Sequence, residues 1–291
     1  MSNSIALFKA YLPILDEVYK NASLTSVLDG APELAQAGMN ANELIIQKMQ
    51  LSGLADYSRS AGYVGGDVTI TNETVKCNFD RGRMFTVDSL DDAETAALAF
   101  GRLSGEFIRT HVVPELDAFR FATYASASDI GAATGTLSAG KSVVEALRKA
   151  HAAMDDAEVP LENRILFITP ALKGAVDDMD TTASRAVMDQ ASQTIVVPQS
   201  RFYTKIKQFD GTTGGETDGG YAKDAEGKAI NFMLIHKDAV IQFQKHVSPK
   251  VISPEQNPDA DAWKFGYRNV GIADVYENKV AGIYCHSVAA A

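Results

Sequence analysis

The segment with the clearest chemical signature is Gly135–Ser142, GTLSAGKS, which fits the phosphate-binding pattern G-x-x-x-x-G-K-S and leads into a helical pattern. In such a loop, backbone N–H groups surround the phosphates, the lysine contacts them and the serine hydroxyl binds magnesium. The residues that would fill these roles are Gly135, Gly140, Lys141 and Ser142. They define one functional hypothesis, a P-loop nucleotide hydrolase.

The surrounding sequence lacks two elements that such a site requires. An apolar strand must deliver the chain to the first glycine, and a second strand that ends in Asp must hold the magnesium ion. Residues 124–134 are too small and polar for a central strand, and the most apolar strand pattern, 164–168, runs into Thr169 and Pro170. We therefore interpret Gly135–Ser142 as a flexible connection to a helix N-terminus.

No other group of residues predicts catalysis. Asp177, Asp178 and Asp180 are neighbours in sequence and point in different directions on a helix, so they favour a solvated helix end over a magnesium site. The five histidines lack metal-ligand spacing, and no G-x-S-x-G elbow occurs. Cys77 and Cys285 are expected to be free thiols. The sequence thus predicts no catalytic residue, no cofactor and no metal.

Composition narrows the function classes further. The chain has 291 residues, 46% hydrophobic and 22% charged, which is typical of a folded protein with a sizeable core. Its net charge of −10, without a Lys/Arg cluster, argues against a nucleic-acid binder, because such proteins gain affinity by placing clustered Lys and Arg on phosphates. The N-terminus lacks a basic signal-peptide region, and no run approaches the ~18 apolar residues of a membrane span. We expect a cytoplasm-like setting and no membrane.

The longest helical pattern covers residues 91–125. Asp91 and Glu94 form a capping-box start, apolar residues then recur at steps of three and four, and Pro114 predicts an end or kink near Val113. This divides the pattern into two pieces. Further helices are predicted at 142–154 and 170–176, the latter capped by Thr169-Pro170.

Strand patterns are short and scattered. They cover residues 44–51, 68–72, 74–79, 84–87, 164–168, 194–197, 231–235, 240–243 and 274–286. Asp80-Arg81-Gly82 is interpreted as a turn, 126–140 as a linker, 210–227 as a mobile surface loop, and 1–35 as an arm with one or two helical turns. The exposed hairpin region before residue 88 has little core of its own, so it needs support from another surface such as a second subunit. The fold class is α+β.

Several segments resemble tailed-bacteriophage major capsid proteins. They are GLADYSRSAGYVGGDVTITNETVKCNFDRGRMFTVD (53–88), Glu94-Thr95, VVPELDAFRF (112–121), AMDDAEVPLENRILFITPALKGAV (153–176), IVVPQSRFYTKI (195–206) and FMLIHKDAVIQFQKH (232–246). The resemblance covers nearly the whole chain and implies the Hong Kong 97-type capsid fold. The implied domains are an N-terminal arm and the start of the peripheral domain (1–52), an extended β-hairpin loop (53–87), a spine helix (88–127), an axial domain (128–246) and return strands of the peripheral domain (247–291).

The implied function is that of a non-enzymatic head protein. It would self-assemble as hexamers and pentamers into an icosahedral shell that encloses double-stranded DNA, inside the virion, after assembly in the host bacterial cytoplasm. A separate scaffolding protein, a portal protein and decoration proteins would be further partners; the scaffold is expected to be separate because no long charged pro-segment precedes the arm. The alternatives are the P-loop hydrolase and an encapsulin-like bacterial compartment.

Charged and aromatic side chains on the loop and spine are the predicted inter-subunit contacts. They are Asp56, Tyr63, Lys76, Asp80, Arg81, Arg83, Glu106, Arg109, Glu115, Asp117 and Arg120. Asp80 and Arg81 are expected at a turn tip, where charges steer and pair across subunits. Lys76 is a nominal candidate for the lysine that some family members cross-link to a neighbouring subunit.

Overall fold

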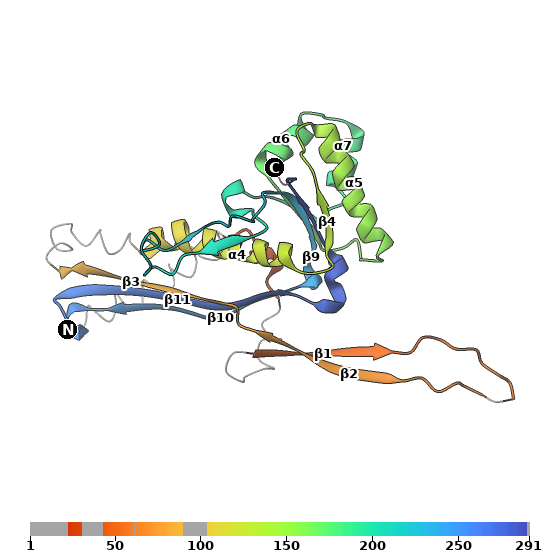
Figure 1. Ribbon diagram of the computed structural model, residues 1–291, viewed down its shortest axis with the longest axis horizontal. Coiled ribbons are helices and arrows are strands. Elements are labelled where there is room, and N and C mark those ends of the chain that lie inside the picture. Colours follow the sequence, from red (N-terminus) through yellow and green to blue (C-terminus); the bar gives the residue numbers. More distant parts are fainter. Residues whose placement is uncertain (1–22, 31–42, 61, 90–103, 290–291) are drawn as a thin grey trace.

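The computed structural model describes residues 23–30, 43–60, 62–89 and 104–289. Within them the chain forms a five-stranded sheet with helices on both faces, a long three-stranded sheet, and a two-stranded hairpin that projects from the body (Figure 1). A small two-stranded sheet pairs β7 (Ile206–Gln208) with β8 (Tyr221–Lys223). The mixture of strands and helices confirms the predicted α+β class.

The five-stranded sheet has the order β4-β12-β9-β5-β6. Its strands are β4 (Gly131–Thr134), β5 (Arg164–Ile168), β6 (Gln193–Val196), β9 (Ile230–His236) and β12 (Ile283–Ser287). Alternate residues of β5 serve different cores: Leu166 packs under the outer helices, and Phe167 packs toward the spine helix. Burial on both faces explains why this strand reads as an uninterrupted apolar run.

Three helices cover the outer face of that sheet (Figure 1). They are α5 (Gly140–Asp156), α6 (Pro170–Asp177) and α7 (Thr182–Met188). The buried face of α5 carries Val143, Leu147, Ala150 and Met154, the residues that the sequence pattern placed together. Thr169 precedes α6 as its N-cap, with Pro170 as the first helical residue, which confirms the predicted start.

The long sheet has the order β10-β11-β3 and is antiparallel throughout. Its strands are β3 (Phe79–Asp88), β10 (Val240–Ile252) and β11 (Ala262–Val275). Aromatic side chains of this sheet, among them Phe79 and Phe265, pack against Ile108 and Leu116 of the spine helix.

Short 3₁₀ turns occupy Ser26–Leu28, Gln199–Arg201, Lys237–Ala239, Pro254–Gln256 and Glu277–Gly282.

The spine helix runs through Pro114 without a break. Residues 104–107 are helical, Ile108–Val112 form a π-helical turn, and α4 continues from Val113 to Ser126. The two-piece prediction is therefore wrong, although the irregularity falls where it was expected. The Val113 N–H bonds to the Ile108 carbonyl, five residues back, and this wider turn displaces the carbonyl that a proline ring would otherwise strike. The predicted capping box at Asp91 lies outside the described residues.

The hairpin consists of β1 (Glu43–Leu51) and β2 (Val68–Lys76), in continuous antiparallel register. β2 is one strand rather than the two that were predicted. The turn predicted at Asp80–Gly82 is also wrong: these residues lie inside β3, where Arg268 of β11 binds the Asp80 carboxylate at 2.6 Å. A Cβ at Gly82 would lie 2.8 Å from the Tyr267 carbonyl oxygen, so glycine here reflects close strand contact.

Three other predictions need correction. The linker 126–140 contains the end of α4 and the edge strand β4, which pairs in parallel with β12. The loop 210–227 contains β8, and the β3 side chains Arg81 and Arg83 donate to its Gly220 and Thr217 carbonyls. The strands predicted within 274–286 are interrupted by the Glu277–Gly282 turn, which separates β11 from β12. The division of the chain into capsid domains stays a prediction.

Candidate assembly surfaces

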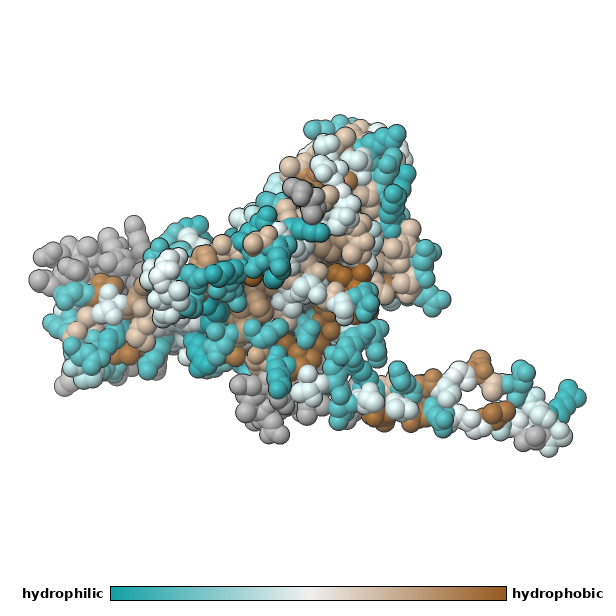
Figure 2. All heavy atoms as spheres, in the orientation of Figure 1, coloured by the Kyte–Doolittle hydropathy of each residue, from teal (hydrophilic) through white to brown (hydrophobic). Residues whose placement is uncertain are grey.

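One face of the hairpin is apolar and uncovered. Met49 lies opposite Ile70, and Leu51 lies opposite Val68. Because side chains alternate along a strand, all four point to the same side. Their exposed fractions are 60% for Met49, 59% for Ile70, 67% for Leu51 and 61% for Val68. These four residues are called here the hairpin apolar face. Hydrophobic, brown atoms are visible along the projecting arm (Figure 2).

The loop between β1 and β2, residues 52–67, adds further exposed apolar side chains. Tyr57 and Tyr63 stack edge to face with ring centroids 4.9 Å apart, and Tyr63 is 91% exposed. Leu54 and Val64 are exposed as well. Eight of the eleven large hydrophobic side chains that are exposed among the described residues lie between positions 49 and 70. Such a concentration marks an interaction surface.

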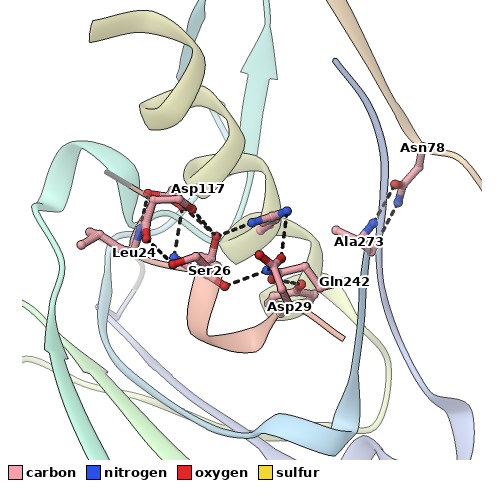
Figure 3. Close-up of polar contacts among 11 residues, drawn as sticks. Leu24, Ser26, Asp29, Asn78, Asp117, Gln242 and Ala273 are labelled. Carbon is pink, nitrogen blue, oxygen red and sulfur yellow. Dashed lines mark hydrogen bonds and ion pairs between the residues drawn. The ribbon is translucent and has the colours of Figure 1, made fainter. Parts of the chain in front are cut away.

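The base of the hairpin is fixed to the body. Between β2 and β3, the Asn78 amide donates to the Ala273 carbonyl at 2.7 Å and accepts from the Ala273 N–H at 3.1 Å (Figure 3). Lys48 pairs with Glu73 of β2 at 2.9 Å and with Glu277 of the body. These contacts hold the apolar face away from the rest of the chain, where nothing in the described residues covers it.

Two predicted contact residues, Arg81 and Arg83, bind the loop between β7 and β8. The Arg81 guanidinium pairs with Glu115 of α4 at 2.7 Å and donates to the Phe209 carbonyl at 2.7 Å. Arg83 donates to the Thr217 carbonyl at 3.1 Å. Within the subunit, these residues therefore tie the loop to β3 and to the spine helix.

Asp117 and Arg120 are buried and used inside the subunit. The Asp117 carboxylate accepts from the Ser23 hydroxyl at 2.8 Å, the Thr25 hydroxyl at 2.7 Å and the Leu24 N–H at 3.1 Å (Figure 3). Arg120 donates to the Thr25 hydroxyl at 2.8 Å. Together they clamp the segment that follows the N-terminal 22 residues onto α4, which leaves neither side chain free for a neighbouring subunit.

Gln242 of β10 completes this clamp from the other side. Its amide donates to the Thr25 carbonyl at 2.7 Å and to Asp29 at 2.6 Å, while its oxygen accepts from the Tyr124 hydroxyl. Burial raises the pKa of the Tyr124 phenol, so it stays a hydrogen-bond donor. Sequence reasoning missed this cluster because its members lie far apart in the chain.

The other predicted contacts are exposed. Lys76 ends β2, Asp56 lies in the hairpin loop, and Glu106 and Arg109 pair with each other at 2.7 Å on the spine helix. Asp80 is exposed beside Arg268, whose hydrogen bonds lower the pKa of the Asp80 carboxyl. Their contacts with other subunits stay a prediction.

The phosphate-loop pattern has a packing explanation. β4 does deliver the chain to Gly135, contrary to expectation, but it is an edge strand. A Cβ at Gly140 would lie 2.2 Å from the Ala175 carbonyl oxygen and 2.7 Å from Met179, so this glycine lets α5 and α6 pack closely. The second glycine of the pattern is therefore accounted for by helix packing rather than by a bound phosphate.

The described part of the chain offers few groups for metal binding or thiol chemistry. There, no three or more His, Cys, Asp or Glu side chains are arranged to hold a metal ion. Cys77 and Cys285 are free thiols, and burial raises the pKa of Cys285 to about 12, which keeps it protonated. No described helix combines the length and hydrophobicity needed to cross a lipid bilayer.

Comparison by structure gives consistent matches, whereas no family model and no curated protein sequence matches the chain. A virus-like particle from Pyrococcus furiosus matches with TM-score 0.62 and 10% identity, over 96% of this chain and 99% of that chain. A Mycobacterium phage Che8 structure matches with TM-score 0.59 and 13% identity, over 89% of both chains. The capsid of cyanophage P-SCSP1u matches with TM-score 0.56 and 12% identity, over 87% of this chain and 85% of that chain.

These matches span nearly the whole chain on both sides, so they define its architecture. The chain has the fold of viral shell subunits, which is the α+β, Hong Kong 97-type fold that the sequence resemblance implied. At sequence identities near one residue in ten, a structural match establishes the fold but not the function. The function is therefore argued from the surfaces described above.

Proposed function

We propose that this chain is the major capsid protein of a tailed bacteriophage, which assembles as hexamers and pentamers into an icosahedral shell around double-stranded DNA. The fold that it shares with phage capsid structures supports this role. The observation that carries the proposal is the hairpin apolar face, a contiguous apolar surface on an arm without a core. In a monomer these apolar side chains stay exposed to water and do not stabilise the chain. A second copy that covers them would bury this apolar surface.

The size of this surface fits a shell better than an isolated dimer. Burying a fully exposed aliphatic side chain contributes about 1.5–3 kcal/mol, so four side chains that are already partly covered contribute roughly 4–7 kcal/mol. Ordering and immobilising two subunits costs an amount of similar size. One hairpin contact is therefore weak on its own, and stability arises when each copy both gives and receives such contacts in a closed assembly.

The charge of the chain agrees with a container for DNA. A net charge of −10 keeps the subunit from binding phosphate tightly, so packaged DNA can move in and out. A separate scaffolding protein, a portal protein and decoration proteins are the further partners of this role. The location is the virion, after assembly in the host bacterial cytoplasm, and the role is structural rather than enzymatic.

The two alternatives receive no comparable support. A P-loop hydrolase needs Gly140 free to approach a phosphate, but Gly140 packs against the Ala175 carbonyl oxygen. An encapsulin-like compartment would use the same kind of shell for protein cargo. The nucleic-acid content of particles from infected cells separates these two shells, since a phage head holds genome-length DNA.

The test replaces the hairpin apolar face and measures assembly. Serine at Met49 and Leu51 together with threonine at Val68 and Ile70 keeps the strands and removes the apolar surface. Purified variant protein is expected to keep its circular dichroism spectrum and thermal midpoint, because these side chains have little contact with the body, and to remain as free subunits in sedimentation velocity.

The matched control changes the opposite face of the same strands. Alanine at Gln50, Thr69 and Thr71 alters three hairpin side chains without touching the apolar face, and this variant should assemble like the parent chain. Normal shells from the apolar-face variant would refute the proposed role of the hairpin.

A further inference from the structure

A cavity of about 210 Å³ lies between β3, the spine helix, β11 and the β7–β8 loop. Its apolar wall includes the aromatic rings of Phe79, Phe85, Phe107 and Tyr267. Phe85 and Phe107 meet edge to face at 4.7 Å, and Phe107 and Tyr267 at 6.3 Å. This wall has the composition of a receptor for an aromatic side chain, since ring pairs in such geometry are favourable beyond their buried area.

The rim of the cavity is polar and rigidly built. The Arg83 guanidinium lies between Gly211 and Gly219, where added Cβ atoms would approach its Nη1 to 3.2 and 2.8 Å. Both glycines have positive φ, of 76° and 69°, so the loop adopts a backbone that favours glycine at both points. Exposed Arg83 and exposed Asp218 thus stand at the mouth with opposite charges.

The loop at the end of the hairpin carries matching chemistry. The edge-to-face pair Tyr57 and Tyr63 presents one ring that is almost fully exposed, and Asp56 and Arg59, before and after Tyr57 in the sequence, carry opposite charges. The hairpin projects away from the end of the molecule where β3 and the β7–β8 loop form the cavity (Figure 1). A chain therefore cannot place its own tyrosines in its own cavity.

We propose that Tyr63 of one copy inserts into this cavity of a second copy, with Asp56 facing Arg83 and Arg59 facing Asp218 across the contact. The inference rests on the proposed shell function and names the surface that receives the hairpin. The two surfaces lie at opposite ends of one subunit, so the contact is heterologous and every copy both gives a tyrosine and receives one. Contacts of this type close into rings when the rotation between copies is a whole fraction of a turn.

Disulfide trapping tests the contact directly. The double variant Val64→Cys with Thr217→Cys, in a Cys77→Ser background, places one thiol next to Tyr63 in the hairpin loop and one next to Asp218 at the rim, and it keeps every residue of the proposed contact. A disulfide forms only when the two Cα atoms come within about 7 Å, so covalent multimers on a non-reducing gel report this docking. The matched control pairs Val64→Cys with Glu226→Cys, which lies on an exposed turn outside the cavity.

The proposal predicts a ladder of covalent multimers from the rim variant and monomer from the control. Shells without the ladder, or equal ladders from both variants, overturn the cavity contact and leave the shell function standing. A ladder without closed shells supports the contact and counts against the shell. If the parent chain forms no shells and the variants form neither a ladder nor shells, both the cavity contact and the shell function are overturned.

Single substitutions at Tyr63 give an independent measurement, because this exposed side chain has no part in folding the subunit. Tyr63→Ala should raise the protein concentration needed for half-maximal assembly by about 10-fold or more, as expected for an aromatic anchor. Tyr63→Phe keeps the ring and should stay within about 3-fold of the parent. An alanine variant that assembles at the parent's concentration would contradict the insertion.

Discussion

Replacement of Asp117 by alanine should destabilise the subunit more than any surface change. Its side chain is fully buried and accepts from the hydroxyls of Ser23 and Thr25 and the N–H groups of Leu24 and Thr25, and it pairs with Arg201 at 3.2 Å. Removing the carboxylate leaves buried donors without an acceptor, at about 1–3 kcal/mol each. Arg201 keeps some contact with solvent, which limits its share.

The expected loss in the free energy of unfolding is about 3–5 kcal/mol, the range for breaking a buried ion pair. Asp117→Asn keeps the shape and one acceptor oxygen, so its loss should be smaller, about 2–3 kcal/mol. Asp56→Ala is the matched control on the exposed hairpin loop and should change stability by less than about 0.5 kcal/mol. Urea unfolding of unassembled chains, followed by circular dichroism, gives all three values. A loss below about 1 kcal/mol for Asp117→Ala would refute the clamp.

Two further predictions concern the outer helices. Gly140→Ala should lose about 2 kcal/mol or more of stability, because its Cβ would meet the Ala175 carbonyl oxygen. Lys141→Ala, on the exposed side of the helix, is the control and should leave stability unchanged. Equally small effects of the two variants in thermal unfolding would contradict the packing role of Gly140. Burial, and then the charge of Arg164, lowers the pKa of His151, so the folded chain binds this proton less readily than the unfolded chain. Stability should therefore fall as pH drops below about 6.5, by at most about 1.4 kcal/mol per pH unit, and His151→Phe should flatten that dependence; an unchanged slope would exclude His151 as its source.

Local sequence patterns predicted the elements whose side chains are buried at a regular spacing. The apolar face of 142–154 and the continuous run 164–168 follow directly from one-sided and two-sided burial. Most of β10 and β11 was not predicted, because the charged residues of these half-exposed strands interrupt the apolar pattern. Pro249 also argues against a strand, but it is tolerated in β10 because β10 forms a sheet edge. Asp80–Gly82 resembles a turn, yet its partner Arg268 lies 188 residues away.

The candidate contacts show the same limit. Exposed hairpin residues such as Asp56 and Tyr63 were recognisable because no core pattern surrounds them in sequence. Asp117 and Arg120 looked like surface charges on an amphipathic helix, but residues 23–29 fold over them and bury both. Only long-range contacts distinguish a charge that joins two segments of one subunit from one that meets a neighbour.

Electron cryo-microscopy of the purified chain tests the central claim most directly. We expect closed shells of hexamers and pentamers, in which each hairpin apolar face is covered by an adjacent copy. Particles that stay monomeric at all concentrations and with scaffold-containing lysate added, or shells in which Met49, Leu51, Val68 and Ile70 face solvent, would contradict it.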